Sequence, residues 1–338
     1  MRGWAVATPG PIDGGPLQLV ERALPTPGPG EIRLRVRTCG VCRTDLHLAE
    51  GDLAPRRAGV IAGHEVVGTV DARGGGTGRF ALDERVGVPW LRGTCGRCRF
   101  CTSGRENLCV TPTFTAWDAD GGFAEWCTVP EAYAYRIPEH FDDERAAPLL
   151  CAGIIGFRAL RQADLANSGS RGRRLGIYGF GGSAHLAAQV ALHQGATVHV
   201  MTRGAAARRH AIDLGCASAQ AADALPPEPL DAALLFAPVG TLVPPALEAL
   251  DRGGTLAIAG IYLSDVPALQ YERHLFYEKR VVSTTANTRA DGEAFLHTAA
   301  EIPVRVTTTP YAFAHADQAL ADLAHGRVNG AAVLRVAT

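Results

Sequence analysis

The segment RRLGIYGFGGSAHLAAQVALHQ, residues 173–194, decides the fold class of this chain. A short apolar run leads into GFGGSA (179–184), and a helix-forming stretch follows and stops at Gly195, a residue suited to ending a helix. GFGGSA fits G-x-G-x-x-G/A, in which the first glycine makes a tight turn and the second lets the backbone approach a pyrophosphate. Between a strand and a helix this pattern predicts a dinucleotide site, and the alternative is a glycine-rich turn without a ligand. The expected cofactor contacts in it are Gly179, Gly181, Gly182, Ser183 and Ala184.

Strand-like and helix-like segments alternate through most of the chain after residue 150. The expected strands are 173–178, 196–202, 231–238, 255–260 and 280–285, and the expected helices are 183–194, 205–214 and one around 246–250. Repeated βα units imply a parallel, doubly wound sheet. Two further helices near 291–300 and 315–325 and a last strand at 331–336 complete the chain.

The first 150 residues have a different texture, dense in Gly and Pro with short β-like runs. EIRLRVR (31–37) alternates strictly, with apolar residues on one face and charged residues on the other, which predicts a half-buried strand. No long helical pattern is present in this part. We therefore expect a β-rich domain beside the α/β domain, as a length of 338 residues also suggests.

Composition restricts the possible partners. Apolar residues make up 47% and charged residues 20%, and the formal net charge is −1, so neither nucleic acid nor an anionic membrane is expected as a partner. No apolar run approaches the ~20 residues that a membrane-spanning helix needs. The opening residues MRGWAVATPG have no apolar signal-peptide core, and we expect a cytoplasmic protein.

The end of the strand after the glycine motif bears on the choice of cofactor. An NAD site normally has Asp or Glu there to bind the ribose 2′-hydroxyl. Here the strand ends in Met201-Thr202-Arg203, and Thr202 can hydrogen-bond a 2′-phosphate while Arg203 can pair with it. Arg208 can assist, whereas Arg209 is better explained as part of a solvated helix face. The pattern favours NADP(H) over NAD(H).

Four cysteines lie close together in TCGRCRFCTSGRENLC (94–109). Cytosolic thiols stay reduced, so metal binding is favoured over disulfides. An iron–sulfur site is the main alternative, but the bacterial ferredoxin run continues x3-C-P after its third cysteine and this one does not. A closed four-thiolate zinc site tolerates the spacing. The expected structural zinc ligands are Cys95, Cys98, Cys101 and Cys109, in a lobe of about residues 91–110.

A second group of metal-binding residue types is present in CGVCRTDLH (39–47) and GHE (63–65). Cys42 and His64 suit zinc, and a catalytic zinc needs three protein ligands and an open position. From residue types alone the third ligand stays open. Cys151, in LLCAGIIG (149–156), is by itself more typical of an inert core thiol.

Together these motifs, with TRAD (288–291), occur in one order along nearly the whole chain, which resembles a zinc-dependent alcohol dehydrogenase of the medium-chain dehydrogenase/reductase family. The resemblance implies that Cys42, His64 and Cys151 bind a catalytic zinc, giving two zinc ions per chain. It also implies a GroES-like catalytic domain, residues 1–152 and 287–338, with a Rossmann domain, residues 153–286, inserted into it.

The resemblance implies further roles around the catalytic zinc. Thr44 and His47 would relay a proton through the cofactor ribose, and Asp45 would orient the imidazole of His64. Glu65 is either a transient zinc ligand or a buried acid paired with an arginine. The remaining expected contacts are Arg289 on the cofactor phosphates, Gly260 and Ile261 against the nicotinamide, and Trp90 and Leu53 in the substrate pocket. For Trp117 we expect packing rather than a pocket role.

These expectations define the activity that we predict. It is reversible hydride transfer between a primary or small secondary alcohol and NAD(P)+, in the class EC 1.1.1.-, with 1.1.1.1 or 1.1.1.2 favoured. Zinc would polarise the substrate oxygen. Alternatives are a related zinc reductase acting on polyols, formaldehyde adducts or activated alkenes, and a noncatalytic nucleotide-binding redox sensor. We also expect a homo-oligomer, either a tetramer or a dimer.

Overall fold

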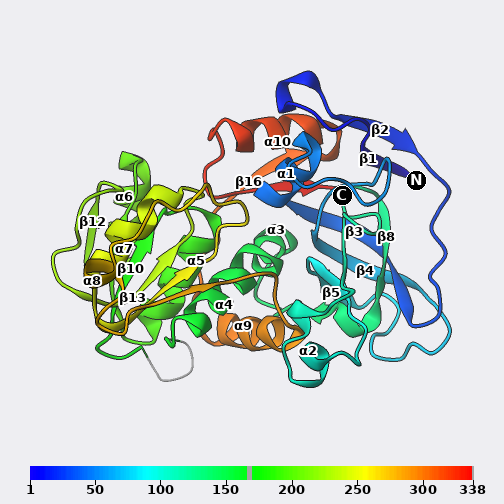
Figure 1. Ribbon diagram of the computed structural model, residues 1–338. Helices are drawn as coiled ribbons and strands as arrows, with labels where there is room; N and C mark the ends of the chain where they lie inside the picture. Colours follow the sequence, from blue (N-terminus) through cyan, green and yellow to red (C-terminus); the bar gives the residue numbers. More distant parts are fainter. Residues whose placement is uncertain (166–169, 337–338) are drawn as a thin grey trace. The chain divides into compact units, whose positions relative to one another are not determined.

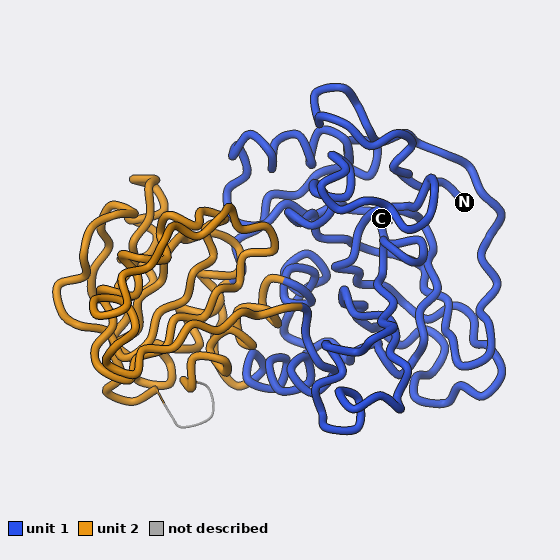
Figure 2. Tube along the Cα trace, viewed as in Figure 1, with its two compact units in different colours: residues 1–151, 286–300, 306–338 blue, residues 152–285, 301–305 orange. Residues whose placement is uncertain are grey.

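The computed structural model describes residues 1–165 and 170–336 and divides into two compact units (Figure 2). Unit 1 comprises residues 1–151, 286–300 and 306–338, and unit 2 comprises residues 152–285 and 301–305. The boundaries expected from the sequence differ by one residue at each junction and leave 301–305 outside unit 2. Those residues join unit 2 because the side-chain amide of Gln189 donates to the carbonyl of Arg305 at 3.0 Å and accepts from its N–H at 2.7 Å.

Unit 2 is built on a six-stranded parallel sheet with the order β12-β11-β10-β13-β14-β15. The chain runs outward on one side of β10 and then returns to β13 on its other side, which makes the doubly wound topology predicted from the sequence. The strands are β10 (Arg174–Tyr178), β11 (Thr197–Met201), β12 (Ser218–Gln220), β13 (Leu230–Leu235), β14 (Leu250–Ile258) and β15 (Arg280–Ser283).

Helices lie on both faces of this sheet (Figure 1), and the central strands are therefore buried on both sides, as parallel strands usually are. The helices are α4 (Ala152–Gln162), α5 (Gly182–His193), α6 (Ala205–Asp213), α7 (Val243–Ala249) and α8 (Tyr271–His274). Helix α7 starts earlier than the expected 246–250, and Leu250 is already the first residue of β14. In this unit and in unit 1, no helix among the described residues is long and apolar enough to cross a membrane.

Unit 1 contains a seven-stranded, largely antiparallel sheet with the order β16-β17-β3-β4-β5-β9, in which β8 also pairs with β3. The strands are β3 (Glu31–Val41), β4 (Glu65–Arg73), β5 (Arg85–Val88), β8 (Trp126–Pro130), β9 (Tyr135–Arg136), β16 (Thr308–Ala312) and β17 (Ala331–Arg335). The alternation predicted for 31–37 is confirmed, because Ile32, Leu34 and Val36 are buried in the core and Arg35 and Arg37 are exposed.

Smaller elements surround that sheet. They include the two-stranded pairs β1 (Arg2–Val6) with β2 (Leu17–Glu21) and β6 (Leu91–Gly93) with β7 (Thr113–Phe114), and the helices α1 (Arg43–Glu50), α2 (Arg99–Thr102), α3 (Asp143–Ala146), α9 (Arg289–Glu301) and α10 (Ala316–Ala324). The sequence interpretation missed α1, whose eight residues are too few for a clear periodic pattern. The missed helix matters because it carries several of the expected site residues.

Candidate active site

The cofactor residues expected from the sequence gather at one edge of the sheet in unit 2. Tyr178 of β10 lies opposite Met201 of β11 and Leu235 of β13, and Leu235 lies opposite Ile258 of β14. The four strands therefore end at the same edge of the sheet, and the loops that follow them all start at this edge. This carboxyl edge, at the point where strand order reverses, is where open α/β sheets bind ligands.

The glycine motif makes the turn that its sequence predicts. Gly179 has φ +84°, and a Cβ there would lie 2.8 Å from the backbone nitrogen of Ala237, so only glycine fits. Gly181 precedes α5 as its N-cap residue, with no side chain capping the helix and open space beside its own α-carbon. The first N–H groups of α5 are thus left for an anion, and the helix dipole favours a phosphate there.

The turn after β11 brings together the residues predicted for a 2′-phosphate. Thr202 is buried and Arg203 is exposed. Arg208 lies one turn into α6, and its Nη1 donates to the carbonyls of Thr202 (2.9 Å) and Arg203 (2.8 Å). Arg208 therefore shapes this turn through the backbone, a role that its sequence position did not reveal. The N-terminus of α6 begins beside the same turn and also has no side-chain cap.

The residues expected against the nicotinamide follow β14. Gly260 and Ile261 lie in the loop after Ile258, at the same carboxyl edge as the glycine motif. Ile261 is 55% exposed, so its side chain is available to contact a ligand.

In unit 1, Cys42, His64, Glu65 and Cys151 form a compact cluster. Their potential metal-binding atoms all lie within 4.8 Å of one another. Cys42 caps the start of α1, His64 and Glu65 stand at the start of β4, and Cys151 directly precedes α4. Ligand sulfurs around a tetrahedral zinc are roughly 3.7 Å apart, so the cluster is compact enough for one metal ion.

A nitrogen and a sulfur of this cluster are suited to bind a cation. The Nε2 of His64 is buried without a hydrogen-bond partner, and a hydrogen bond from the Cys151 thiol lowers the pKa of Cys42 well below its ordinary value. A thiolate and an orphaned imidazole nitrogen facing the same point are what a borderline-soft cation such as Zn²⁺ requires.

Asp45 hydrogen-bonds to two members of this cluster. Its Oδ1 accepts from Nδ1 of His64 at 2.9 Å and from the N–H of Gly63 at 3.0 Å, and its Oδ2 accepts from the N–H of Cys42 at 2.9 Å. One buried carboxylate thus fixes both the imidazole and the cysteine backbone. It also fixes the tautomer that turns Nε2 of His64 towards the cluster.

Glu65 belongs to the cluster and not to an ion pair. In the described part of the chain no arginine pairs with it, which removes the alternative of an arginine-paired acid. Burial raises the pKa of Glu65 well above its usual range. Gly40 makes room for this side chain, because a Cβ at Gly40 would overlap the Glu65 carboxylate.

Helix α1 carries the two residues that the sequence predicts for a proton relay. The buried Thr44 hydroxyl lies 4.0 Å from the sulfur of Cys42, and His47 follows one turn later. Nδ1 of His47 is 2.9 Å from a carboxylate oxygen of Asp52, whose side chain is 41% exposed. Asp52 was missed by the sequence analysis. It connects the imidazole to the surface, and its only sequence signal is its position just beyond the end of α1.

The expected pocket residues Leu53 and Trp90 come before and after His64 in the chain. The ring of Trp90 meets the ring of His64 edge-on, with centroids 5.0 Å apart. Leu53 is half-buried in the loop after α1, and its N–H donates to the carbonyl of His47 at 3.0 Å. Trp90 and Leu53 therefore both adjoin residues of the metal cluster or the relay.

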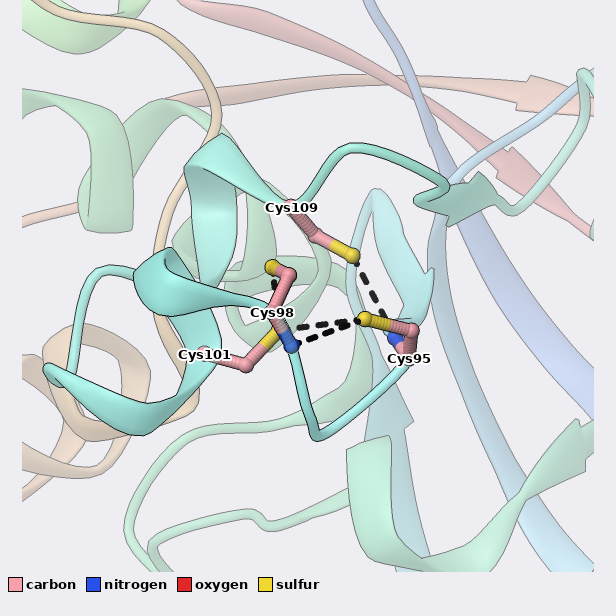
Figure 3. A group of neighbouring side chains, drawn as sticks. All are labelled: Cys95, Cys98, Cys101 and Cys109. Carbon is pink, nitrogen blue, oxygen red and sulfur yellow. Dashed lines mark hydrogen bonds between the residues drawn. The ribbon is translucent and has the colours of Figure 1, made fainter.

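The four cysteines of residues 94–109 converge in a separate lobe (Figure 3). The sulfur of Cys101 lies 3.5 Å from that of Cys98 and 3.9 Å from that of Cys95, distances far too long for a disulfide. Backbone N–H groups of Cys95 and Thr111 donate to the sulfur of Cys109. Backbone hydrogen bonding, first from Cys101, lowers the pKa of Cys98 to about 6. Burial by itself would raise the pKa of Cys109, but hydrogen bonds, first from the backbone of Cys95, lower it, whereas burial raises the pKa of Cys101 to about 11. The case for a four-sulfur metal site therefore rests on the convergence of the sulfurs.

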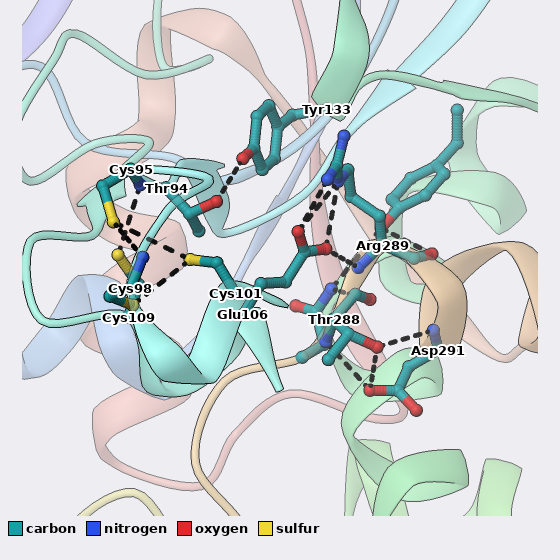
Figure 4. A network of polar contacts seen from close by, with 12 residues as sticks. Thr94, Cys95, Cys98, Cys101, Glu106, Cys109, Tyr133, Thr288, Arg289 and Asp291 are labelled. Atoms are coloured by element: carbon teal, nitrogen blue, oxygen red, sulfur yellow. Dashed lines mark hydrogen bonds and ion pairs between the residues drawn. The ribbon is translucent and has the colours of Figure 1, made fainter. Parts of the chain in front are cut away.

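Arg289, expected on the cofactor phosphates, lies next to this lobe (Figure 4). Its Nη2 and Nε reach the carboxylate of Glu106 at 2.7–3.1 Å, its backbone N–H donates to the same carboxylate at 2.8 Å, and its guanidinium lies over Tyr133. Burial by itself would raise the pKa of Glu106, but the hydrogen bonds from Arg289 outweigh it and lower the pKa. The sequence analysis missed Glu106, which lies 183 residues from its partner.

Helix α9 starts at this contact. Thr288 and Asp291 cap each other in front of it, because the N–H and hydroxyl of Thr288 donate to the Asp291 carboxylate and the N–H of Asp291 donates to the Thr288 hydroxyl. The helix therefore begins at Arg289 and not at 291 as expected, and Glu106 stabilises its first turn.

Comparisons with known proteins agree with this geometry. Residues 28–139 match the family described as alcohol dehydrogenase GroES-like domain. The chain is 56% identical over 341 residues to "Probable alcohol dehydrogenase AdhA" of Mycobacterium tuberculosis, covering 99% of this chain and 97% of that protein. It is 32% identical over 336 residues to an alcohol dehydrogenase of Geobacillus stearothermophilus, covering 95% and 96%.

Solved structures extend the similarity to the whole fold. The cinnamyl alcohol dehydrogenase SbCAD4 of Sorghum bicolor superposes with a TM-score of 0.88 at 27% identity, covering 99% of this chain and 97% of that one. A thermostable alcohol dehydrogenase of Pyrobaculum aerophilum with bound cobalt and zinc gives 0.86 at 26%, covering 99% of both chains. A Sinorhizobium meliloti protein with bound NADP gives 0.82 at 25%, also covering 99% of both.

The sheet edge with its glycine turn, the cluster around His64, the four-cysteine lobe and these full-length similarities agree. The chain belongs to the zinc-type alcohol dehydrogenases of the medium-chain dehydrogenase/reductase family.

Proposed function

We propose that this protein is a zinc-dependent alcohol dehydrogenase and aldehyde reductase that prefers NADP(H). The observation that carries the proposal is the cluster of Cys42, His64 and Cys151, in which Asp45 turns a buried, unpartnered imidazole nitrogen towards two half-buried thiols. A site that merely binds a nucleotide has no use for such a cluster or for the relay beside it, so this observation argues against a noncatalytic sensor.

Cys42, His64 and Cys151 would hold the catalytic zinc, with Glu65 as an additional oxygen ligand within reach. Bound there, Zn²⁺ supplies Lewis acidity to a carbonyl or hydroxyl oxygen, and a bound nicotinamide supplies or takes the hydride. Asp45 keeps His64 in the one tautomer that can bind the metal. Burial of His64 and Glu65 limits the access of bulk water on their side of the group.

The proton leaves or arrives by way of α1. The Thr44 hydroxyl, 4.0 Å from the Cys42 sulfur, exchanges it with the substrate oxygen. His47, which follows Thr44 by one helical turn in α1, would take the proton onward, and Asp52 orients its imidazole. The partly exposed Asp52 carboxylate then delivers the proton to water.

NADP(H) is the cofactor that the turn after β11 favours. No carboxylate stands at the end of that strand, Thr202 and Arg203 offer a hydroxyl and a positive charge, and the uncapped start of α6 adds backbone N–H groups. A 2′-phosphate gains charge-assisted hydrogen bonds from this combination. Arg208 contributes by holding the two carbonyls of the turn in place.

A second zinc would occupy the lobe of Cys95, Cys98, Cys101 and Cys109, and its role would be structural because four thiolates leave no open position. None of the nine cysteines, all within the part of the chain that the structure describes, forms a disulfide. We also propose a cytoplasmic location, where thiols stay reduced.

We also propose a homo-oligomer. Strand β15 is the edge of the sheet in unit 2, its Val281 is 40% exposed, and the preceding segment adds the exposed rings of Tyr271, Phe276 and Tyr277. An unpaired edge with apolar neighbours is a template for pairing with a second copy. Light scattering coupled to size exclusion tests this, and a monomer at micromolar concentration contradicts it.

The first experiment compares initial rates of NADPH and NADH oxidation with benzaldehyde on zinc-replete protein whose metal content has been measured. We expect two zinc ions per chain and faster turnover with NADPH. Faster turnover with NADH would overturn the cofactor assignment and leave the metal chemistry intact. Absence of turnover with benzaldehyde and with a panel of aliphatic aldehydes would overturn the proposed activity.

A further inference from the structure

The ring of Trp90 beside His64 is one member of a larger aromatic cluster in unit 1. Trp90 lies nearly parallel to Trp117, with centroids 5.9 Å apart and an angle of 14°, and Phe114 packs against both rings at 5.0 and 5.6 Å. A backbone hydrogen bond from Thr115 to the carbonyl of Trp90 ties the two segments together. These packed rings form a continuous aromatic wall that begins beside His64.

Arg56 contacts Trp117, one of the rings of this wall. Its guanidinium carbon lies 3.7 Å from the centroid of the Trp117 ring, and its Nη1 donates to both carboxylate oxygens of Asp118 at 3.1 and 3.2 Å. The Trp117 indole N–H in turn donates to the carbonyl of Ala54 at 2.8 Å. The ring is thus held by its flat face and by its polar edge, and both contacts come from the same loop.

That loop, residues 51–57, follows α1 and also carries Asp52 and Leu53. The contacts of Arg56 and Ala54 with Trp117 therefore join the relay side of the site to its aromatic side. Because Asp118 neutralises Arg56, the junction offers no net charge to a substrate. The wall suits a neutral, planar group better than an anionic one.

We propose that Arg56 is a positioning residue that determines substrate specificity. By holding Trp117 flat it keeps Trp90 in the orientation that stacks on an aryl group, so the enzyme prefers aryl aldehydes to short aliphatic ones. This inference rests on the proposed function, since it concerns selectivity among substrates of the same reaction. If the aromatic side chains are already ordered in the free enzyme, less conformational entropy is lost when a substrate binds. An aryl group that stacks on these rings benefits from this order, whereas a short alkyl chain, which does not stack, benefits little.

The test compares Arg56→Ala and Arg56→Lys with Arg57→Ala as the matched control. Arg57 is the next residue and forms an ion pair with Asp120 at 3.6 Å, but it is not among the cations found over a ring in the described structure. For each protein, kcat and KM are measured with benzaldehyde and with butanal at saturating NADPH. Near-ultraviolet circular dichroism without substrate reports how rigidly the tryptophans are held.

We expect Arg56→Ala to lower the benzaldehyde-to-butanal ratio of kcat/KM about three- to tenfold, mainly through the KM for benzaldehyde. Arg56→Lys should not restore the ratio, because an ammonium group does not stack flat on an indole. The near-ultraviolet signal should weaken in Arg56→Ala and stay unchanged in Arg57→Ala.

Three results would overturn the inference: an unchanged ratio in Arg56→Ala, an equal loss with both aldehydes, or the same drop in Arg57→Ala. The proposed function is judged separately, by whether the wild-type enzyme reduces either aldehyde at all. An enzyme that reduces both aldehydes, with a ratio insensitive to Arg56, refutes the inference alone.

Discussion

The contact between Glu106 and Arg289 provides a sharp test of how the cysteine lobe is attached to unit 1. Replacement of Glu106 by Gln preserves the shape of the side chain and removes its charge. Breaking a fully buried ion pair typically costs about 3–5 kcal/mol. Here the Glu106 side chain is 11% exposed but that of Arg289 is 42% exposed, so water compensates for part of the loss.

We therefore expect Glu106→Gln to destabilise the protein by about 2 kcal/mol at pH 7, or about 3 °C in Tm for a chain of 338 residues. Glu106 is the first residue of η2 (Glu106–Leu108), which leads directly to the proposed ligand Cys109, so the lobe should also release zinc faster to a chromogenic chelator. Differential scanning fluorimetry and the chelator assay measure the two effects.

The matched control is Glu293→Gln on the same helix. Glu293 pairs with Arg79 at 3.3 Å, but its side chain is 61% exposed, and such surface pairs contribute about 0–1 kcal/mol. The control should therefore change Tm by at most about 1 °C and leave zinc release unaffected.

The pH dependence gives a second criterion. Arg289 holds the pKa of Glu106 below its ordinary value in the folded protein, so the stabilisation is present above the unfolded-state pKa of about 4.3 and is lost as the pH falls through the lower, folded-state pKa. The gap in Tm between wild type and Glu106→Gln should narrow towards low pH. The reasoning is refuted if Glu106→Gln is no less stable than the control at pH 7, or if its deficit is undiminished at acid pH.

Other parts of the site make separate predictions. Asp45→Asn should weaken retention of the catalytic metal about ten- to a hundredfold, because the His64 tautomer is no longer enforced; metal analysis after graded chelation checks this, and full retention would contradict it. Thr202→Asp should lower the NADPH-to-NADH ratio of kcat/KM at least about tenfold by placing a carboxylate against the 2′-phosphate, and steady-state kinetics with both cofactors would expose an error if the ratio held. Cys101→Ser should reduce the zinc content from two ions to one and lower Tm while leaving the cofactor dissociation constant unchanged; a protein that still carries two zinc ions would speak against the four-thiolate site. Asp52→Asn should lower kcat for alcohol oxidation about tenfold near pH 7 and alter its pH profile, and an unchanged profile would remove Asp52 from the relay.

Features that depend on residues close together in the chain could be predicted from the sequence. The tight turn from strand to helix requires a positive φ, which Gly179 adopts. The turn could therefore be predicted from the glycine motif alone. Ile32, Leu34 and Val36 share one face because side chains alternate along a strand. Cys95 to Cys109 span fifteen residues, so one loop can bring their sulfurs together.

Contacts between side chains that are distant in the sequence became apparent only in the folded structure. Cys151 lies 109 residues from Cys42 (151 minus 42), and residue types alone left it as one buried thiol among others. Glu106 finds Arg289, and Arg56 finds Trp117, through the pairing of separate segments and not through any local pattern. The reason is physical: a local motif is specified by sterics and hydrogen bonding within a few residues, whereas these contacts form only after the core has packed and fixed where each loop emerges.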